Sequence, residues 1–203
     1  MPEGTEATPV PEKTAASTTA PAATAAPATP PAAAPKPAPV AWESPLVEAL
    51  RARFGAAILN AASYLGQNYL VLDRKAALEV ITALRQAGYT TLTDLTAVHY
   101  PKDELPFEMV WILHNMTANE RIRVKARYAE GEKVASLTDL WLAANWLERE
   151  VYDMFGIAFL DHPDLRRILM PEGWAGHPLR KDYAPNLQDQ DWVRKNLGIE
   201  SGQ

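Results

Sequence analysis

The chain has no cysteine among its 203 residues. Disulfides, thiolate nucleophiles, cysteine-ligated zinc and almost all iron–sulfur clusters need that residue, so this chain holds none of them by itself. If the protein serves redox chemistry, it can only position a redox centre that other chains hold.

Long apolar runs are also missing. No stretch reaches the roughly 18 to 20 continuous apolar residues of a membrane-spanning helix. The first residues carry acids where a signal peptide is basic, and prolines interrupt the alanines that follow. We therefore expect a protein that is soluble or peripheral to a membrane, with the cytoplasm as the default location.

Basic residues are outnumbered, with 20 Lys and Arg against 25 Asp and Glu and a net charge of -5. Nucleic-acid binding needs a basic surface that releases counterions, so the composition argues against it. A local basic stripe exists in 121–128, where Arg121, Arg123, Lys125 and Arg127 alternate with apolar residues. The stripe is either a solvated strand face, which we favour, or a surface that meets an acidic partner.

The N-terminal part has little that could form a core. Residues 1–41 are mostly alanine, proline and threonine, which favours a disordered tail. The length of the rest fits one domain. We expect an α+β domain over 42–160 and an extended docking arm with the C-terminal tail over 161–203, where prolines, glycines and aromatic residues show no regular period.

Capping and periodicity signals predict three helices. Ser44 and Pro45 begin the first, which Gly55 ends, and Asp73 caps a second that ends at Gly88. Its shared face contains Ala77, Leu78, Ile81 and Leu84. A third helix is expected from a cap within 136–139 to Gly156, with this apolar face: Leu140, Ala144, Leu147, Val151 and Met154.

Strand signals lie between these helices. They predict a hairpin of 57–62 with 69–72 and a meander of 91–100, 107–115 and 121–128. Helices packed on a mainly antiparallel sheet make an α+β fold, with the extended C-terminal arm and the disordered N-terminal tail attached.

The stretch from Asn145 to Met170 is dense in charge, with five acids, three arginines and a histidine. Glu148 and Glu150 cannot grip one substrate together, because residues two apart on a helix point roughly 200° away from each other. Asp153 shares a helix face with Glu150 and with Arg149. The plain interpretation is an ion-paired helix surface, in which an exposed pair contributes only about 0.3–0.5 kcal/mol.

A metal site is a weaker alternative. His162, His177, Asp161 and Asp164 carry suitable ligand atoms, but the histidines lie apart in loops and form no compact ligand motif. Glycine-rich phosphate loops and nucleophile elbows are missing from the sequence as well. On the residues alone, a noncatalytic interaction domain is favoured over an enzyme.

The spacing of the charged stretch resembles a known family signature. Its parts are Glu148-Arg149-Glu150, Asp153-Met154-Phe155, His162, Arg166 and Ile168-Leu169. This pattern resembles the 30 kDa subunit of respiratory complex I, which is the C subunit of bacterial NADH-quinone oxidoreductase. The similarity extends from about Trp42 to Tyr183 and includes 136–138 and 176–183. Asp161 stands where the family leads us to expect glycine, and His99 stands near a position that is often acidic.

The resemblance implies a noncatalytic subunit of the peripheral arm, on the cytoplasmic side of the cell inner membrane. The complex passes electrons from NADH through FMN and iron–sulfur centres to quinone, coupled to proton translocation, and this subunit binds none of these groups. The implied partners are the quinone-site D subunit and the cluster-bearing subunits, and membrane contact comes only through the complex. The alternatives are a similar subunit of a membrane-bound hydrogenase or ferredoxin-quinone complex, and a free-standing metallohydrolase.

We expect the charged residues to act as an interface and structural signature, with no catalytic, cofactor-binding or metal-binding residue in the chain. One group would fix the loop after the third helix: Glu148, Arg149, Glu150, Asp153, His162, Asp164, Arg166 and Arg167. A second group would clamp the extended tail on the neighbouring subunit: Arg180, Lys181 and Asp182. His177 belongs to the same family signature.

Overall fold

The computed structural model describes residues 37–183 and 190–198. The predicted disorder of the N-terminal tail therefore falls mostly outside the described residues. Strand β1, Val40–Ala41, already belongs to the sheet, so regular structure begins just before the expected start at Trp42. The division into a domain at 42–160 and an arm beyond it stays a prediction.

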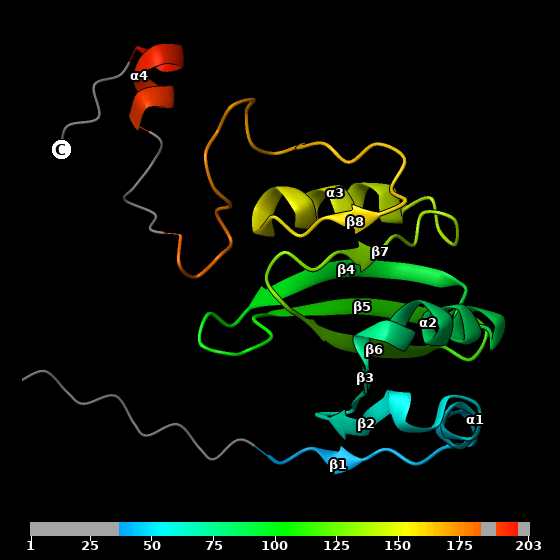
Figure 1. The fold of residues 1–203 in the computed structure, drawn as a ribbon. Helices are drawn as coiled ribbons and strands as arrows, with labels where there is room; N and C mark the ends of the chain where they lie inside the picture. The colour runs from blue at the N-terminus through cyan, green and yellow to red at the C-terminus, as the bar shows by residue number, and fades with distance from the viewer. Residues whose placement is uncertain (1–36, 184–189, 199–203) are drawn as a thin grey trace, which may run out of the picture. The chain divides into compact units, whose positions relative to one another are not determined.

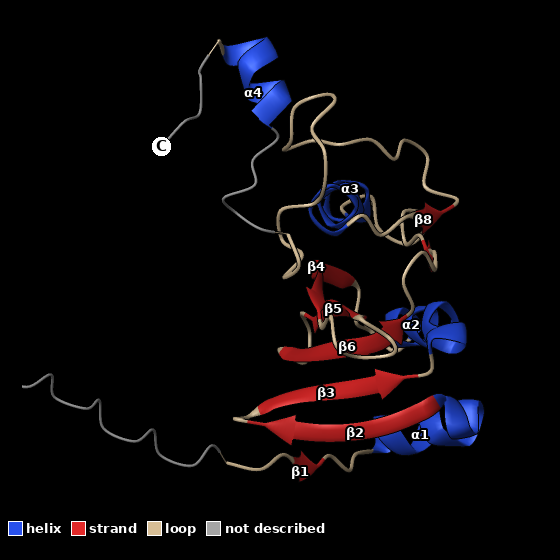
Figure 2. Cartoon of the chain, turned by 60° about the vertical axis from the view of Figure 1, so that its left-hand side comes forward, coloured by secondary structure: helices blue, strands red, loops and turns tan. Residues whose placement is uncertain are grey.

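Six strands form the main sheet in the order β1-β2-β3-β6-β5-β4 (Figure 2). After β1 come β2 (Ile58–Tyr64), β3 (Gln67–Leu72), β4 (Thr91–His99), β5 (Phe107–Asn115) and β6 (Glu120–Tyr128). Neighbouring strands are antiparallel except β3 and β6, which are parallel. A separate parallel pair joins β7 (Val134–Ala135) to β8 (Phe159–Leu160). The predicted α+β fold with a mainly antiparallel sheet is confirmed.

Helices α1 (Pro45–Phe54) and α2 (Ala77–Gln86) form where their caps predict them. The Ser44 hydroxyl accepts the Val47 N–H at 3.3 Å, and Asp73 caps the 3-10 turn Arg74–Ala76 that leads into α2. Another 3-10 turn, Gly55–Ala57, joins α1 to β2. The chain also contains α3 (Ala144–Phe155) and α4 (Gln190–Leu197). Helix α4 was not expected within the extended tail.

One face of the sheet supplies the core. On β5, the side chains of Met109, Trp111 and Leu113 are buried, and the alternate positions of β6 pack beside them. Helix α3 packs against β4, at the end of the sheet order opposite to β1 and β2 (Figure 1). This position leaves the C-terminal end of α3 beside the segment that follows the helix in the sequence.

Two details of the predicted helices are wrong. Residues 136–143 contain turns at 138–140 and 142–143 and no helix, so α3 starts at Ala144 and Leu140 lies before it. The Ser136 hydroxyl accepts the Thr138 N–H at 3.1 Å within a turn, and it donates to the Glu148 carboxylate instead of capping a helix. On α2, Leu78 is 39 % exposed, and the buried face is formed instead by Ala77, Val80, Ile81, Ala83 and Leu84.

Candidate functional site: a charged joint between helix and arm

The segment 161–183, which we call the arm, returns along the C-terminal end of α3. Gly156 ends the helix with a φ of 77°, a left-handed conformation that glycine adopts without strain. The last carbonyls of a helix have no partner within it, and here the arm supplies donors. His177 Nδ1 donates to the Asp153 carbonyl at 2.9 Å, and the Leu179 N–H donates to the Met154 carbonyl at 3.1 Å.

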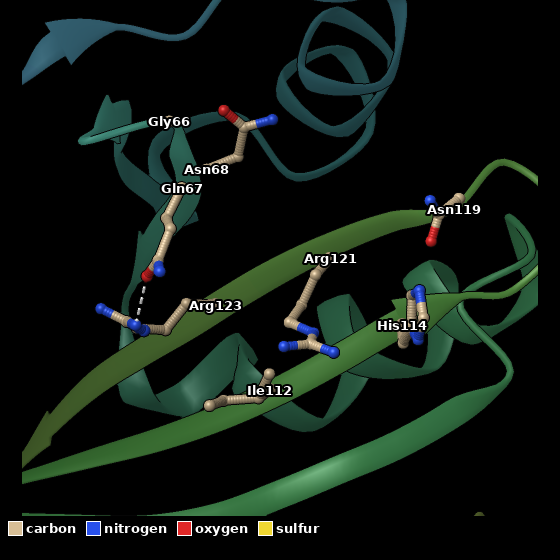
Figure 3. Close-up of a pocket in the computed structure, with 8 residues that line it drawn as sticks. All are labelled: Gly66, Gln67, Asn68, Ile112, His114, Asn119, Arg121 and Arg123. Carbon is tan, nitrogen blue, oxygen red and sulfur yellow. Dashed lines mark hydrogen bonds between the residues drawn. The ribbon is translucent and has the colours of Figure 1, made fainter.

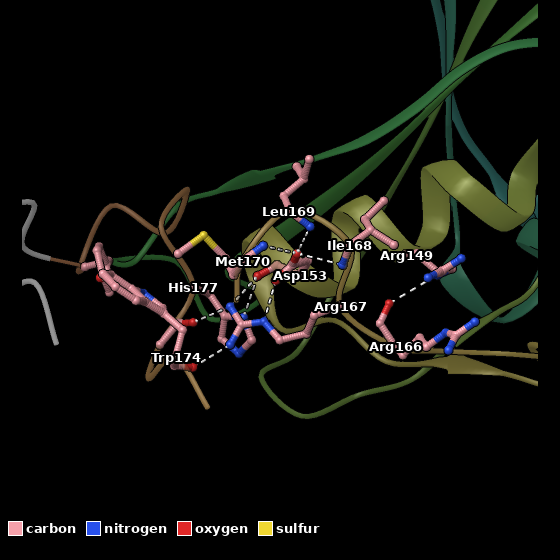
Figure 4. A network of polar contacts seen from close by, with 11 residues as sticks. Arg149, Asp153, Arg166, Arg167, Ile168, Leu169, Met170, Trp174 and His177 are labelled. Atoms are coloured by element: carbon pink, nitrogen blue, oxygen red, sulfur yellow. Dashed lines mark hydrogen bonds and ion pairs between the residues drawn. The ribbon is translucent and has the colours of Figure 1, made fainter. Parts of the chain in front are cut away.

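We call the contacts between α3 and the arm the joint. Asp153 lies at its centre, and its side chain is fully buried. One carboxylate oxygen accepts backbone N–H groups from Ile168, Leu169 and Met170 at 3.0, 2.6 and 2.9 Å (Figure 4). The other oxygen accepts from Arg167 Nε in an ion pair whose arginine is partly exposed. Three consecutive N–H groups pointing at one anion resemble the backbone cradles that bind anions in other proteins.

The electrostatic balance at Asp153 favours the carboxylate. Burial by itself raises the pKa of Asp153, but hydrogen bonds from Met170, Arg167 and the two neighbouring N–H groups outweigh it. The pKa of Asp153 is therefore held below its usual range, and the joint is built around an ionised acid.

Arg167 connects this anion to the far part of the arm. Its guanidinium donates to the Trp174 carbonyl at 2.6 Å and to the Gly176 carbonyl at 2.9 Å, besides Asp153. Trp174 Nε1 in turn lies 3.2 Å from the Tyr183 hydroxyl. A single guanidinium thus fixes 174–176 against α3, which its planar set of five donors suits well.

Glu148 forms a second buried contact, one turn and a half earlier on α3. Its carboxylate accepts the Leu137 N–H at 2.6 Å and the Ser136 hydroxyl at 2.7 Å. Burial raises the pKa of Glu148 to about 7, although both hydrogen bonds oppose this shift. Glu148 therefore ties the turns before the helix to the helix itself.

The other charged residues of the signature are placed less deeply. Arg149 Nε donates to the Arg166 carbonyl at 3.2 Å, and its guanidinium lies 4.7 Å from the centre of the Trp146 ring. Arg166 and Asp164 form an exposed pair at 3.0 Å. Glu150 is exposed and has no ion pair among the described residues. The ion pair expected on the helix surface between Arg149 and Asp153 is wrong, because Asp153 points inward and pairs with Arg167.

The two histidines considered as metal ligands bind backbone groups instead. His162 Nε2 donates to the Asn145 carbonyl at 3.2 Å, while its Nδ1 accepts the Asp164 N–H at 3.0 Å. His177 caps α3 as described above. Within residues 37–183 and 190–198, no group of three or more acids and histidines could hold a metal ion.

The segment 180–182 is anchored on its own domain. Arg180 donates to the Phe155 carbonyl at 2.7 Å and pairs with Glu130 at 2.6 Å. The Lys181 N–H donates to His99 Nδ1 at 3.1 Å, and the Asp182 carboxylate lies 3.7 Å from the same nitrogen. Docking of this segment on a neighbouring subunit stays a prediction.

Several partners in the joint were not predicted from the sequence. His99 attracted attention only as a departure from the family, and it is a buried acceptor stacked on Phe107 at 4.8 Å between ring centres. Asp161 adopts a φ of 60°, a left-handed turn that Asp tolerates in place of glycine.

Gly156→Ala is expected to weaken the joint. A Cβ at Gly156 would lie 2.6 Å from His177 Nε2, so the imidazole must move away from the helix end. Gly131→Ala is a matched control, because its φ of 73° is similar and nothing lies within 4 Å of the added carbon. We expect about 1–2 kcal/mol of unfolding free energy lost in the control and about 1–3 kcal/mol more at Gly156. Urea unfolding measures both; equal losses would contradict close packing of His177.

The fold and the joint define a class of protein: an α+β domain whose buried charges bind an arm to a helix. The comparisons with known proteins identify the family. Residues 70–189 match the family of the respiratory-chain NADH dehydrogenase 30 kDa subunit, and the chain belongs to this family.

Individual relatives agree with this assignment. The chain is 45% identical over 153 residues to the C subunit of NADH-quinone oxidoreductase from Citrifermentans bemidjiense, covering 74% of this chain and 95% of the relative. The corresponding protein of Rhodobacter capsulatus is 57% identical over 95 residues, covering 47% of this chain and 48% of that protein. Homologues of the chain are thus subunits of an oxidoreductase complex, as the sequence resemblance implied.

Two solved structures share the fold. A trypsin-resistant fragment of Nqo5 has a TM-score of 0.52 at 30% identity, covering 59% of this chain and 96% of the fragment. A chain of an archaeal membrane-bound sulfane sulfur reductase has a TM-score of 0.57 at 21% identity, covering 76% of this chain and 90% of that chain. The second likeness supports only the fold. None of the helices in the described parts of our chain is long and apolar enough to span a membrane.

Proposed function

We propose that the chain is the noncatalytic structural subunit of the peripheral arm of a proton-translocating NADH-quinone oxidoreductase. In this proposal other subunits hold the FMN, the iron–sulfur centres and the sites for NADH and quinone. The lack of cysteine supports it, because the usual clusters need thiolate ligands. Membership of the 30 kDa subunit family supports the assignment to the complex.

The observation that carries the proposal is the full use of Asp153 within the chain. Both carboxylate oxygens bind the arm, and the side chain is fully buried. A carboxylate buried in this way is not available to a substrate. The charged signature therefore has a structural role, because it fixes the path of the arm on α3. An arm held in one conformation can fit the surface of a neighbouring subunit.

Apolar side chains on the arm suit a partner surface. Leu169 is 60% exposed and Leu179 is 53% exposed, although both neighbour residues that bind α3. A rigid backbone that presents apolar side chains loses little conformational entropy when a partner covers them. The proposed partners are the quinone-site D subunit first and the cluster-bearing subunits beside it, on the cytoplasmic side of the inner membrane.

Arg180→Glu is expected to lower the amount of assembled complex at least about 10-fold, a loss of about 1.4 kcal/mol or more in assembly free energy. The new carboxylate cannot donate to the Phe155 carbonyl, and it would face Glu130. A tagged chain expressed in a strain that lacks its own subunit, followed by mild detergent extraction and mass spectrometry, measures the complex.

Arg51→Glu is the matched control, because Arg51 is an exposed cation on α1 and its reversal changes net charge equally. The control should assemble like the unchanged chain. If Arg180→Glu also assembles fully with complete NADH-quinone activity, the arm has no role in assembly. If the unchanged chain brings down no cluster-bearing subunit, the proposed function is wrong.

A further inference from the structure

A hollow of about 380 Å³ lies on the sheet face opposite the core, at the ends of β3, β5 and β6 (Figure 3). Its lining consists of Gly66, Gln67, Asn68, Ile112, His114, Asn119, Arg121 and Arg123. Two arginines, one histidine and three amide side chains line the hollow, and none of the lining residues is an acid. The hollow is therefore suited to an anionic group.

The cations of the hollow differ from the rest of the basic stripe. Lys125 and Arg127 are already paired with Glu108, at 2.9 and 3.1 Å. Arg121 is exposed and has no ion pair among the described residues, and Arg123 donates to the neutral Gln67 side chain at 2.6 Å. Two positive charges thus lack a counter-charge on a chain whose net charge is -5.

The acid next to Arg121 on β6, Glu120, bonds a different residue. The Glu120 carboxylate accepts the Tyr89 hydroxyl at 3.0 Å, and Tyr89 belongs to the core. This hydrogen bond fixes the Glu120 side chain beside Tyr89. Within the described residues, Glu120 forms no ion pair with Arg121. The arrangement keeps the cation at the rim of the hollow open to a partner.

A second hollow of about 230 Å³ continues the first along the same face. The two share Gln67 and Arg123, and the second adds Pro39, Tyr64, Tyr69 and Lys125. Lys125 Nζ lies 5.7 Å from the centre of the Tyr69 ring. We call the joined hollows the basic groove. Its two adjoining parts and its aromatic end fit an extended peptide better than a single small anion.

We propose that the basic groove binds an extended acidic segment of a partner subunit, whose carboxylates pair with Arg121 and Arg123. These arginines are two residues apart on one strand, so their attachment points are about 6.6 Å apart. Acids at alternate positions of an extended segment have the same spacing and lie on the same side. This inference rests on the proposed function, since it names the chemistry of one contact within the assembly.

A protein segment fits the groove better than a lipid surface. A flat anionic membrane attracts broad basic faces, whereas Glu108 and Asp103 already neutralise much of this face beside the groove. A concave site with two guanidinium groups that form no ion pair within the described residues is suited to bidentate pairing with individual carboxylates. Such pairs select the partner and its register.

The first test compares assembly in the deletion strain. The double variant Arg121→Glu with Arg123→Glu should lower the assembled complex at least about 10-fold, and its difference from the unchanged chain should shrink when salt is raised during extraction, because salt screens the ion pairs that the unchanged chain forms. The control, Arg51→Glu with Lys102→Glu, reverses two other exposed cations and should assemble normally. Circular dichroism and urea unfolding of both purified chains establish that each one folds.

The second test identifies the occupant directly. The chain lacks cysteine, so Ile112→Cys gives a single thiol on the floor of the groove for a benzophenone label. Photolysis in the assembled complex should attach a partner peptide that has acids at alternate positions. Charge reversal at Arg121 and Arg123 should reduce this product at least about 10-fold. Raised salt should also reduce the product in the unchanged complex, because it screens the same ion pairs.

The outcomes separate this inference from the proposed function. If the unchanged chain assembles while the charge-reversed variant matches its control, the basic groove is not a docking site. Labelling of a second copy of the chain, of lipid, or of a segment without acids would also overturn the inference. A failure of the unchanged chain to assemble contradicts the proposed function instead.

Discussion

Asp153→Asn is expected to release the arm from α3 and to lower the unfolding free energy by about 3 kcal/mol, the lower end of the cost of breaking a buried ion pair, because the Arg167 side chain is 22 % exposed. The amide has one acceptor oxygen where the carboxylate has two. Either Arg167 or the N–H groups of 168–170 would then face an NH₂ group. This is a large part of the roughly 5–15 kcal/mol that stabilises a typical domain.

Limited trypsin digestion measures the release of the arm. The arm contains four cleavage sites, Arg166, Arg167, Arg180 and Lys181. If opening becomes about 3 kcal/mol easier, cleavage there should accelerate by about 100-fold, since each 1.4 kcal/mol is a factor of ten. Glu150→Gln makes the same change of carboxylate to amide at an exposed position of α3, and it should leave the rate unchanged. Equal rates in the two variants would contradict the role of Asp153.

The pH dependence of Asp153 has a definite sign. Its pKa is lower in the folded chain than in the unfolded one, so its stabilisation is fully present above the unfolded pKa. The stabilisation is lost as the pH falls through the folded pKa. Asp153→Asn should therefore lose less stability than the unchanged chain when both are acidified.

Glu148 contributes the opposite pH dependence, and Glu148→Gln is expected to remove it. Burial raises the pKa of Glu148 from 4.5 to about 7, so the folded chain binds an extra proton between these values. The stability of the unchanged chain should fall as the pH rises across this window, by up to about 3 kcal/mol in total. The glutamine does not titrate, and its oxygen can still accept the Leu137 N–H.

Urea unfolding at pH 5 and pH 8 tests this expectation. Glu148→Gln should match the unchanged chain at pH 5 and exceed its stability at pH 8. Glu148→Ala leaves the buried Leu137 N–H without its acceptor, so it should be less stable by about 1–3 kcal/mol at both pH values. A glutamine variant with the same pH profile as the unchanged chain would show that Glu148 stays ionised across the window.

Local signals in the sequence predicted most of the elements. Ser44, Gly55, Asp73 and Gly88 act on neighbouring residues, and the helices and turns that they bound were found where expected. The start of α3 was missed because Ser136 bonds a residue twelve positions away. The parallel pairing of β3 with β6 was also missed, since alternation shows which face is buried and not which strand lies beside it.

The sequence singled out some of the residues that the structure brings together around Asp153, but it did not predict their geometry. Spacing picked out Asp153 and Arg167, but a helical wheel pairs Asp153 with Arg149 on the surface. The Asp153 carboxylate bonds the N–H groups of 168–170 instead, because the chain reverses direction after Gly156. A periodic sequence pattern does not predict such a reversal. The contact of His99 with Lys181 spans 82 residues and was equally hidden.

If the charged signature organises structure and takes no part in catalysis, its loss should change the amount of complex and not the chemistry of each complex. The most direct measurement is NADH-quinone turnover per assembled complex, normalised to bound FMN, in a strain carrying Asp153→Asn. We expect a reduced amount of complex whose turnover per FMN equals that of the unchanged complex. A normal amount of complex with turnover lowered at least about 10-fold, the scale of one lost transition-state contact of about 1.4 kcal/mol, would contradict this structural role.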